Sequence, residues 1–335
     1  MSQGTSICQT TPERLRELYL PIREELDQVE EILRAELRSD HPFVDRLVRH
    51  GFRLGGKRLR PALVLLSGKA VGKTTREHVV LATVMEMVHT ATLIHDDVLD
   101  EACLRRHLET VNARWDNEAS VLLGDFLFAR SMCLASSLES SFASRAISEA
   151  TEKMCEGELR QAGSRGEFDL REEEYLEIIS GKTAALCACC CRLGAHHAGA
   201  DPEVCDAFAR FGQQFGIAFQ IIDDVLDLRG TEAVAGKSLG TDLNKQKPTL
   251  PVIRLLGQLA PPERAEVVAI LGRSEDHRAK TLLPWLQRYD AINYAQQAAM
   301  RFVRQARKEL DQVPAGTPAR ETLKQLADFA ILRDQ

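Results

Sequence analysis

The chain has 335 residues, of which 44% are hydrophobic and 27% charged, and its formal net charge is −6. This composition supplies a sizeable core and excludes disordered and collagen-like chains, and an acidic protein has no general attraction for nucleic acid. We find no run near the ~18 apolar residues of a membrane span and no apolar leader. The sequence therefore predicts a cytoplasmic protein with no transmembrane segment and no nucleic-acid partner.

Helical periodicity begins near Pro21, a residue that suits the first turn of a helix. Apolar residues then recur every three or four positions, at Ile22, Leu26, Val29, Leu33 and Leu37. Similar patterns cover about 75–100, 118–137, 141–162, 172–196 and 203–228, and further helices are expected from about 248 to the end. No pair of strands with a hairpin turn is recognisable, so the predicted fold class is all-α.

Nothing in the chain resembles a linker between two folding units, so we expect one domain over residues 1–335, with about ten disordered residues at its start. Four of the nine cysteines fall in the segment Cys187–Cys191. Consecutive helical residues point in different directions, which favours small core residues in a reducing compartment over disulfides. A zinc site with His196 or His197 fits no usual spacing, and the role of the cysteines stays open.

The sequence DDVLD occurs twice, each time at the end of a strongly apolar segment. The six carboxylates belong to Asp96, Asp97, Asp100, Asp223, Asp224 and Asp227. The first and last aspartates of each copy are four residues apart, so they share a helix face and repel each other. Oxygen ligands without histidine or cysteine favour a hard cation, Mg²⁺ before Zn²⁺. One copy alone would also fit a solvated acidic helix end, but two copies predict a site for magnesium and phosphate.

Basic residues accompany both acidic motifs. Lys57, Arg58 and Arg60 follow a glycine pair and precede a predicted helix, where backbone N–H groups and cations form an anion site. Others lie near the two motifs or in the polar segment 229–248, at Arg105, Arg106, Lys182, Lys237 and Lys247. Each alone would fit ordinary surface charge. Together they indicate a pocket for diphosphates.

Five motifs in order resemble those of the trans-isoprenyl diphosphate synthases, the polyprenyl synthetases of long-chain type: GGKRLRP, LIHDDVLD with a following arginine pair, SGKTAAL, FQIIDDVLD and GKSLGTDLNKQKPTLP. The resemblance spans about residues 50 to 255. It implies a helical bundle around a central cavity and a transferase that condenses isopentenyl diphosphate head-to-tail onto an allylic diphosphate. It also implies a homodimer, with a small accessory subunit as the alternative, and Mg²⁺ as cofactor, three ions per site, replaceable by Mn²⁺.

The resemblance assigns roles residue by residue. The six aspartates and Lys182 are the expected catalytic residues, and Asp96, Asp100 and Asp223 the expected metal ligands. Isopentenyl diphosphate is expected at Lys57, Arg60 and His89 with help from Arg106, and Arg58 is included as substrate-binding. The allylic substrate is expected at Arg105, Lys182, Thr183, Gln220, Lys237 and Lys247.

Two histidines are weighed separately. His89 lies on the apolar helix before the first acidic motif, where a lone histidine is more often a core residue, and Glu86 with His89 also spells the Glu-x-x-His of di-iron bundles. That alternative requires a second Glu-x-x-His, and the chain has none. His107 stands where the family usually has glycine, so we expect a change in local loop shape and not in activity.

The mechanism that follows needs no side-chain nucleophile, because loss of diphosphate from an allylic carbon leaves a delocalised cation that the second substrate attacks. Metal ions and fixed cations stabilise the charge that develops on the leaving group. A non-catalytic subunit of a heteromeric synthase is the rival from another class, but such a subunit should lack one acidic motif.

Product length is predicted from the helix before Asp96, along which the growing chain must extend. Ala91 and Thr92 lie one turn below Asp96, about 6–7.5 Å down the axis, and Val88 one turn further. Ala91 and Thr92 are small, whereas short-chain enzymes of the family commonly have an aromatic residue at their turn, and Val88 is not large enough to close a tunnel alone. We therefore expect a product of C30 or longer, with the C20 and C15 products as alternatives. The primer and the pathway that uses the product are not determined by the sequence.

Overall fold

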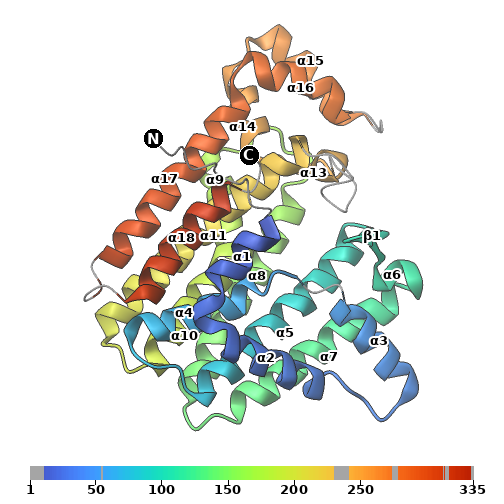
Figure 1. The fold of residues 1–335 in the computed structure, drawn as a ribbon. Helices are drawn as coiled ribbons and strands as arrows, with labels where there is room; N and C mark the ends of the chain where they lie inside the picture. The colour runs from blue at the N-terminus through green and yellow to red at the C-terminus, as the bar shows by residue number, and fades with distance from the viewer. Residues whose placement is uncertain are drawn as a thin grey trace, which may run out of the picture.

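The structure is a computed structural model that describes residues 11–53, 56–229, 241–273, 278–311, 313 and 317–332; Figure 1 shows its bundle of helices. The elements are, in chain order, α1 (Thr11–Leu18), η1 (Leu20–Ile22), α2 (Arg23–Glu36), α3 (Pro42–Arg53), α4 (Leu59–Val71), α5 (Arg76–Leu99), β1 (Leu104–Arg105), β2 (Leu108–Glu109), α6 (Val111–Arg114), α7 (Asn117–Ser136), α8 (Ser141–Gly163), α9 (Glu172–Ile179), η2 (Ser180–Ala184), α10 (Ala185–His197), α11 (Pro202–Arg229), α13 (Thr241–Asn244), α14 (Leu250–Gln258), α15 (Pro261–Gly272), α16 (Arg278–Arg288), α17 (Ala291–Asp311) and α18 (Pro318–Leu332).

The core lies between long helices that are apolar on more than one side. α5 packs against α2, α4 and α7, while α10 packs against α4 and α11, and α17 covers α11. α15 and α16 stand at one end of the bundle, away from α5 (Figure 1). One continuous set of buried apolar residues extends from Leu15 to Ala330. The all-α prediction is confirmed, and this continuous core supports the single domain, which stays a prediction.

The predicted helices are found with small shifts at their ends. Pro21 lies in the 3₁₀ turn η1, so the first amphipathic helix begins at Arg23. The helix expected over 172–196 contains a π turn, η2, between α9 and α10. The polar segment 229–248 contains the short helix α13. The expected disorder at the start of the chain lies outside the described residues.

A small hairpin contradicts the expectation that the chain has none. β1 and β2 pair antiparallel, with Arg105 opposite Leu108. The two residues between them, Arg106 and His107, both have positive φ, at 54° and 63°. Two central residues of this kind form the turn that matches the twist of a hairpin, and glycine or asparagine usually supplies them. Strand pairing this short has no periodic signal in the sequence, which is why the prediction was wrong here.

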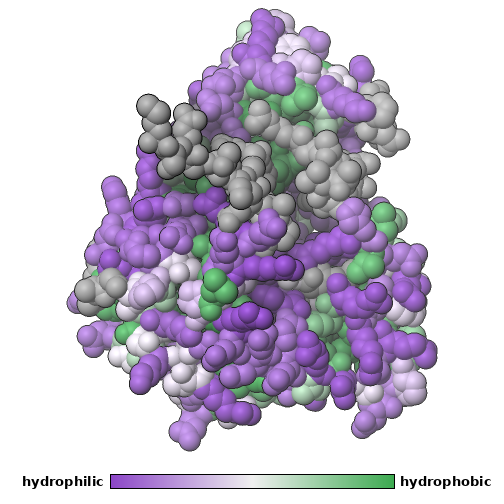
Figure 2. Space-filling model, viewed as in Figure 1, coloured by the Kyte–Doolittle hydropathy of each residue, from purple (hydrophilic) through white to green (hydrophobic). Residues whose placement is uncertain are grey.

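Two helical segments, α7 and Glu172–His197, are long and apolar enough to cross a membrane by length and composition. One or two such helices are weak evidence for a membrane span, so the expected absence of a transmembrane segment stays a prediction. The segment Glu172–His197 is 72% buried inside the bundle, as a core helix of a soluble protein would be. α7 is 39% buried and exposes Val121 and Leu122. Hydrophilic side chains predominate on the face drawn in Figure 2, and apolar ones form separate patches there.

Close approach of α10 and α11 depends on Gly212, because a Cβ at this position would lie 2.4 Å from the backbone oxygen of Cys187. Gly212→Ala should therefore force the two helices apart and cost about 1–3 kcal/mol of folding free energy. Thermal melting of the purified variant measures the loss.

The matched control is Gly257→Ala on α14, where a Cβ would meet nothing within 4 Å. Replacing a helical glycine with alanine there should leave the melting temperature unchanged or raise it. Equal melting temperatures for the two variants would contradict the packing argument.

Candidate active site

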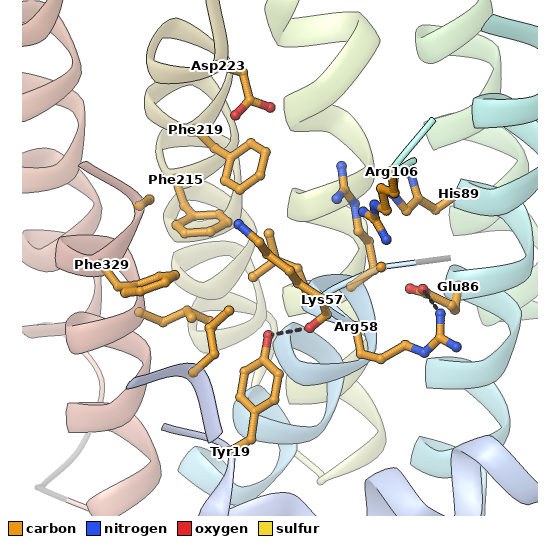
Figure 3. A pocket seen from close by; sticks show the side chains of 16 residues that line it. Tyr19, Lys57, Arg58, Glu86, His89, Arg106, Phe215, Phe219, Asp223 and Phe329 are labelled. Carbon is orange, nitrogen blue, oxygen red and sulfur yellow. Dashed lines mark hydrogen bonds and ion pairs between the residues drawn. The ribbon is translucent and has the colours of Figure 1, made fainter. Parts of the chain in front are cut away.

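A pocket opens between the start of α4, the middle of α5 and α11. The first and last helices of the chain, α1 and α18, also contribute to its wall. Figure 3 shows Lys57 and Arg106 directed toward its centre, with His89 beside Arg106 and Asp223 at the far end. Three aromatic residues, Phe215, Phe219 and Phe329, line the opposite side. The pocket therefore combines a cationic wall with an apolar one.

Two cations of this wall, Arg60 and Arg106, are held in place by packing. Arg60 is 9% exposed and lies over the ring of Phe219 at 5.9 Å. The guanidinium of Arg106 lies against the backbone of Gly56, where a Cβ would be 2.1 Å from one of its nitrogens. Burial and the nearby charges of Arg60, Arg105 and Arg106 hold the pKa of His89 well below its usual value. His89 is therefore neutral at pH 7 and can donate one hydrogen bond to an anion.

The three aspartates of the first motif occupy different environments at the end of α5. Asp97 is buried, and its Oδ1 accepts from Nε (2.9 Å) and lies 2.8 Å from Nη2 of Arg105. Asp100 accepts from Nζ of Lys247 at 2.7 Å, and although burial opposes it, this lysine holds the pKa of Asp100 below its usual value. Burial raises the pKa of Asp96 to about 6 against the opposing charge of Lys182.

The aspartates of the second motif, on α11, also occupy different environments. Asp224 is buried, and its two oxygens accept from the Tyr175 hydroxyl at 2.7 Å and from Nε2 of Gln220 at 2.8 Å. Burial, then the charge of Asp242, raises the pKa of Asp224 to about 8. Asp227 accepts from the backbone N–H of Asp242 at 3.1 Å, so the start of α13 is fixed to this motif.

A π turn presents the next pair of predicted residues. Lys182 lies in η2, and its Nζ contacts Oε2 of Glu158 at 2.5 Å and donates to Oε1 of Gln161 at 2.8 Å, both on α8. Thr183 donates its hydroxyl to Oε1 of Gln220 at 2.7 Å. Single π turns inside α-helices are frequent at functional sites, because the extra residue redirects the side chains that follow.

The donor set fits a hard divalent cation that shares its coordination with substrate oxygens. Both motifs supply carboxylates alone, and in the described residues no three acidic, histidine or cysteine side chains form a complete metal site. Magnesium usually takes one or two protein carboxylates and fills its other positions with water and phosphate oxygens. The candidate ligands Asp96, Asp100 and Asp223 stay predictions.

Predicted residues that line this pocket include Lys57, Arg60, His89, Arg106 and Asp223, and their substrate roles stay predictions. Other predicted cations are already paired with carboxylates. Arg105 already forms an ion pair with Asp97, and Arg58 pairs with Glu30 and Glu86, pointing away from the pocket centre in Figure 3. Lys237 lies outside the described residues. The structure adds polar partners that the sequence analysis missed, at Tyr19, Glu30, Glu86, Glu158, Gln161 and Tyr175.

Comparison with known proteins identifies relatives along most of the chain. A family model described as polyprenyl synthetase matches residues 41–284. Octaprenyl diphosphate synthase of Escherichia coli (strain K12) is 36% identical, over 90% of this chain and 93% of its own length. Heptaprenyl diphosphate synthase component 2 of Bacillus subtilis (strain 168) is 33% identical, over 93% of this chain and 88% of its own.

Among solved structures, the polyprenyl synthase from Caulobacter crescentus CB15, complexed with calcium and isoprenyl diphosphate, superposes with a TM-score of 0.91. It is 33% identical and covers 96% of this chain and 98% of its own. These findings confirm the resemblance drawn from the motifs, the fold it implied and the prediction of a transferase.

The elevated pKa of Asp224, about 8, predicts a pH-dependent stability. The folded protein binds this proton more tightly than the unfolded chain, so the contribution is complete at low pH and is lost as the pH rises from about 4 through 8. Asp224→Asn stays neutral throughout. In melting experiments with chelator, its melting temperature should rise relative to that of the unsubstituted protein between pH 6 and pH 9. A difference that does not change with pH would contradict the assignment.

Proposed function

The chain belongs to the polyprenyl synthetase family, and from this premise we propose that it condenses isopentenyl diphosphate onto an allylic diphosphate, with Mg²⁺, to make an all-trans polyprenyl diphosphate of C30 or longer. The alternative products within the same chemistry are geranylgeranyl (C20) and farnesyl (C15) diphosphate. The relatives named above make octaprenyl and heptaprenyl diphosphates, which favours the longer product.

The observation that carries the proposal is the shape and charge of the pocket. Lys57, Arg60 and Arg106 can neutralise a diphosphate, and the neutral His89 can donate to it. The aromatic wall opposite accepts a short apolar group such as isopentenyl, and it ends at Asp223 of the second motif. A simple carboxylate would not need three cations, and a nucleotide would need polar groups where the phenylalanines lie.

The second cationic group suits the allylic substrate. Lys182 and Thr183 lie on the π turn, and Lys247 lies against Asp100, so these side chains border both acidic motifs. As the allylic bond breaks, negative charge develops on the diphosphate, and fixed cations stabilise it where it forms. When bound, Mg²⁺ ions, three by family resemblance and replaceable by Mn²⁺, would add Lewis-acid stabilisation of the same charge.

The chain's own residues then protect the reacting carbon. The rings of Phe215 and Phe219 follow one another on α11 with centroids 6.0 Å apart, directly before Asp223. They exclude water from the space between the two substrates, which preserves a carbocation against hydrolysis. The double bond of isopentenyl diphosphate supplies the electron pair, and a proton leaves the adduct, for which the released diphosphate can serve as the base.

The assembly is proposed as a homodimer in the cytoplasm. α7 exposes Leu122 by 60% and Val121 by 43%, and a second copy of this helix would cover such a face. A small accessory subunit is the alternative, since one relative is named as component 2 of a synthase.

Product analysis with labelled isopentenyl diphosphate, several allylic primers and Mg²⁺ tests the reaction. Asp96→Ala and Asp223→Ala should each lower turnover at least ~30-fold, because each removes about 2 kcal/mol or more of transition-state stabilisation. Both variants should keep their helical content by circular dichroism, since removal of a carboxylate relieves repulsion.

Asp206→Ala is the matched control, because Asp206 lies on α11 like Asp223 but its side chain is 54% exposed on the surface. It should retain full turnover. Unchanged rates in Asp96→Ala or Asp223→Ala at saturating Mg²⁺ would refute the metal-ligand assignment.

Chain length provides a further test. Ala91 and Val88 are fully buried on α5, and Thr92 is partly exposed with its hydroxyl bonded to the backbone oxygen of His89. Ala91→Phe should shorten the product to about C15–C20 while the first condensation continues, because the ring fills the space one turn below Asp96. Val88→Phe, about 4.5 Å further down, should give an intermediate length. An unchanged length in Ala91→Phe would place the limit elsewhere.

A further inference from the structure

Arg58 is the residue of the GGKRLRP motif that does not join the cationic wall. Its backbone has φ 52° and ψ 36°, a left-handed conformation that non-glycine residues rarely adopt. It occupies the N-cap of α4, and its carbonyl accepts the first hydrogen bond of the helix, from Ala62 at 3.0 Å. Such a conformation persists only where the surrounding contacts impose it.

Those contacts come from two helices that are distant in the sequence. Nε of Arg58 contacts Oε1 of Glu30 on α2 at 2.5 Å, and Nη1 contacts Oε1 of Glu86 on α5 at 2.7 Å. The guanidinium also lies over the ring of Phe52 at 4.7 Å. In Figure 3 the side chain of Arg58 runs toward Glu86, while Lys57 points to the opposite side.

Glu86 is the more buried of the two carboxylates. Its side chain is 2% exposed, against 27% for Glu30, and its Oε2 has no hydrogen-bond partner in the described part of the chain. A buried carboxylate is costly unless it is paired, so Arg58 and Glu86 require each other. The negative charge of Glu86 also acts against the burial that lowers the pKa of Arg106, and so helps to keep that guanidinium charged.

We infer that Arg58 and Glu86 form a positioning pair, in which Glu86 fixes the backbone turn that presents Lys57 and Arg60 to the diphosphate of isopentenyl diphosphate. The inference rests on the proposed function. Arg58 separates Lys57 from the start of α4, so a change in its backbone would move both neighbouring cations. Tyr19, which donates its hydroxyl to the Lys57 backbone oxygen at 2.9 Å, supports the same turn from the other side.

The alternative is that Arg58 binds the diphosphate directly, as its place in the motif had suggested. The two roles differ in how substitutions combine. A residue that acts through its partner loses its effect once the partner is removed, whereas a direct ligand keeps it, so a double-mutant cycle separates them.

The experiment compares Arg58→Gln, Glu86→Gln and the double variant by steady-state kinetics with each substrate varied in turn. Each single substitution should raise the KM for isopentenyl diphosphate about 10-fold and leave the allylic KM unchanged. The KM of the double variant for isopentenyl diphosphate should lie within about 2-fold of the higher of the two single-variant values. Effects that multiply to about 100-fold, or an unchanged KM in Glu86→Gln, would overturn the inference.

Three controls keep the result decisive. Glu30→Gln removes the more exposed carboxylate and should change the same KM less than about 3-fold.

Lys57→Ala tests the proposed function separately. If this substitution leaves the KM for isopentenyl diphosphate unchanged, the pocket assignment fails. If it raises that KM while Glu86→Gln has no effect, only the positioning pair is refuted. Glu86→Gln could melt below the assay temperature, and the double variant then replaces it, because it leaves no unpaired charge between the two positions. Its KM for isopentenyl diphosphate is compared with that of Arg58→Gln. The inference requires the two KM values to be equal.

Discussion

Compensation of buried charge at the ends of two apolar helices governs the rest of the site. The core helices α5 and α11 each carry three carboxylates near their ends, and burial penalises the charges of Asp96, Asp97, Asp100 and Asp224. Cations and a hydroxyl from other parts of the chain compensate these charges. Lys247 reaches Asp100 and Arg105 reaches Asp97, while Tyr175 donates to Asp224. The elements α9 and β1 and the chain around α13 thus each contribute a contact to the acidic motifs.

The same compensation divides each acidic motif into two kinds of carboxylate. Asp97 and Asp224, the second residues of their motifs, are buried and bonded to side chains of neighbouring elements. They contact Arg105 and Gln220, whereas Asp96 and Asp223 are partly exposed, and Asp223 lines the pocket. Substitution of an inner aspartate should therefore disturb the arrangement of the site, whereas substitution of an outer one removes a candidate ligand directly.

Local patterns in the sequence predicted much of this structure. The amphipathic periods placed α5, α7, α8 and α11 to within a few residues, because each is long and strongly patterned. Side-chain pairs between distant helices could not be predicted from such local patterns. Arg58 and Glu86 are 28 residues apart, and Tyr175 and Asp224 are 49 apart. Nothing local to Arg58 distinguishes it from Arg60, so the motif alone assigned both to the substrate.

Close contact between backbone segments also helps to position the cations. Gly157 on α8 and Gly181 on η2 face each other, and a Cβ on Gly157 would lie 2.5 Å from the backbone nitrogen of Lys182. The two glycines let the π turn approach α8 closely enough for Glu158 to reach Nζ of Lys182. Gly56 performs the same task for Arg106 on the other side of the pocket. Lys182 and Arg106 thus each depend on glycine, because the close approach at these two places leaves no room for a Cβ.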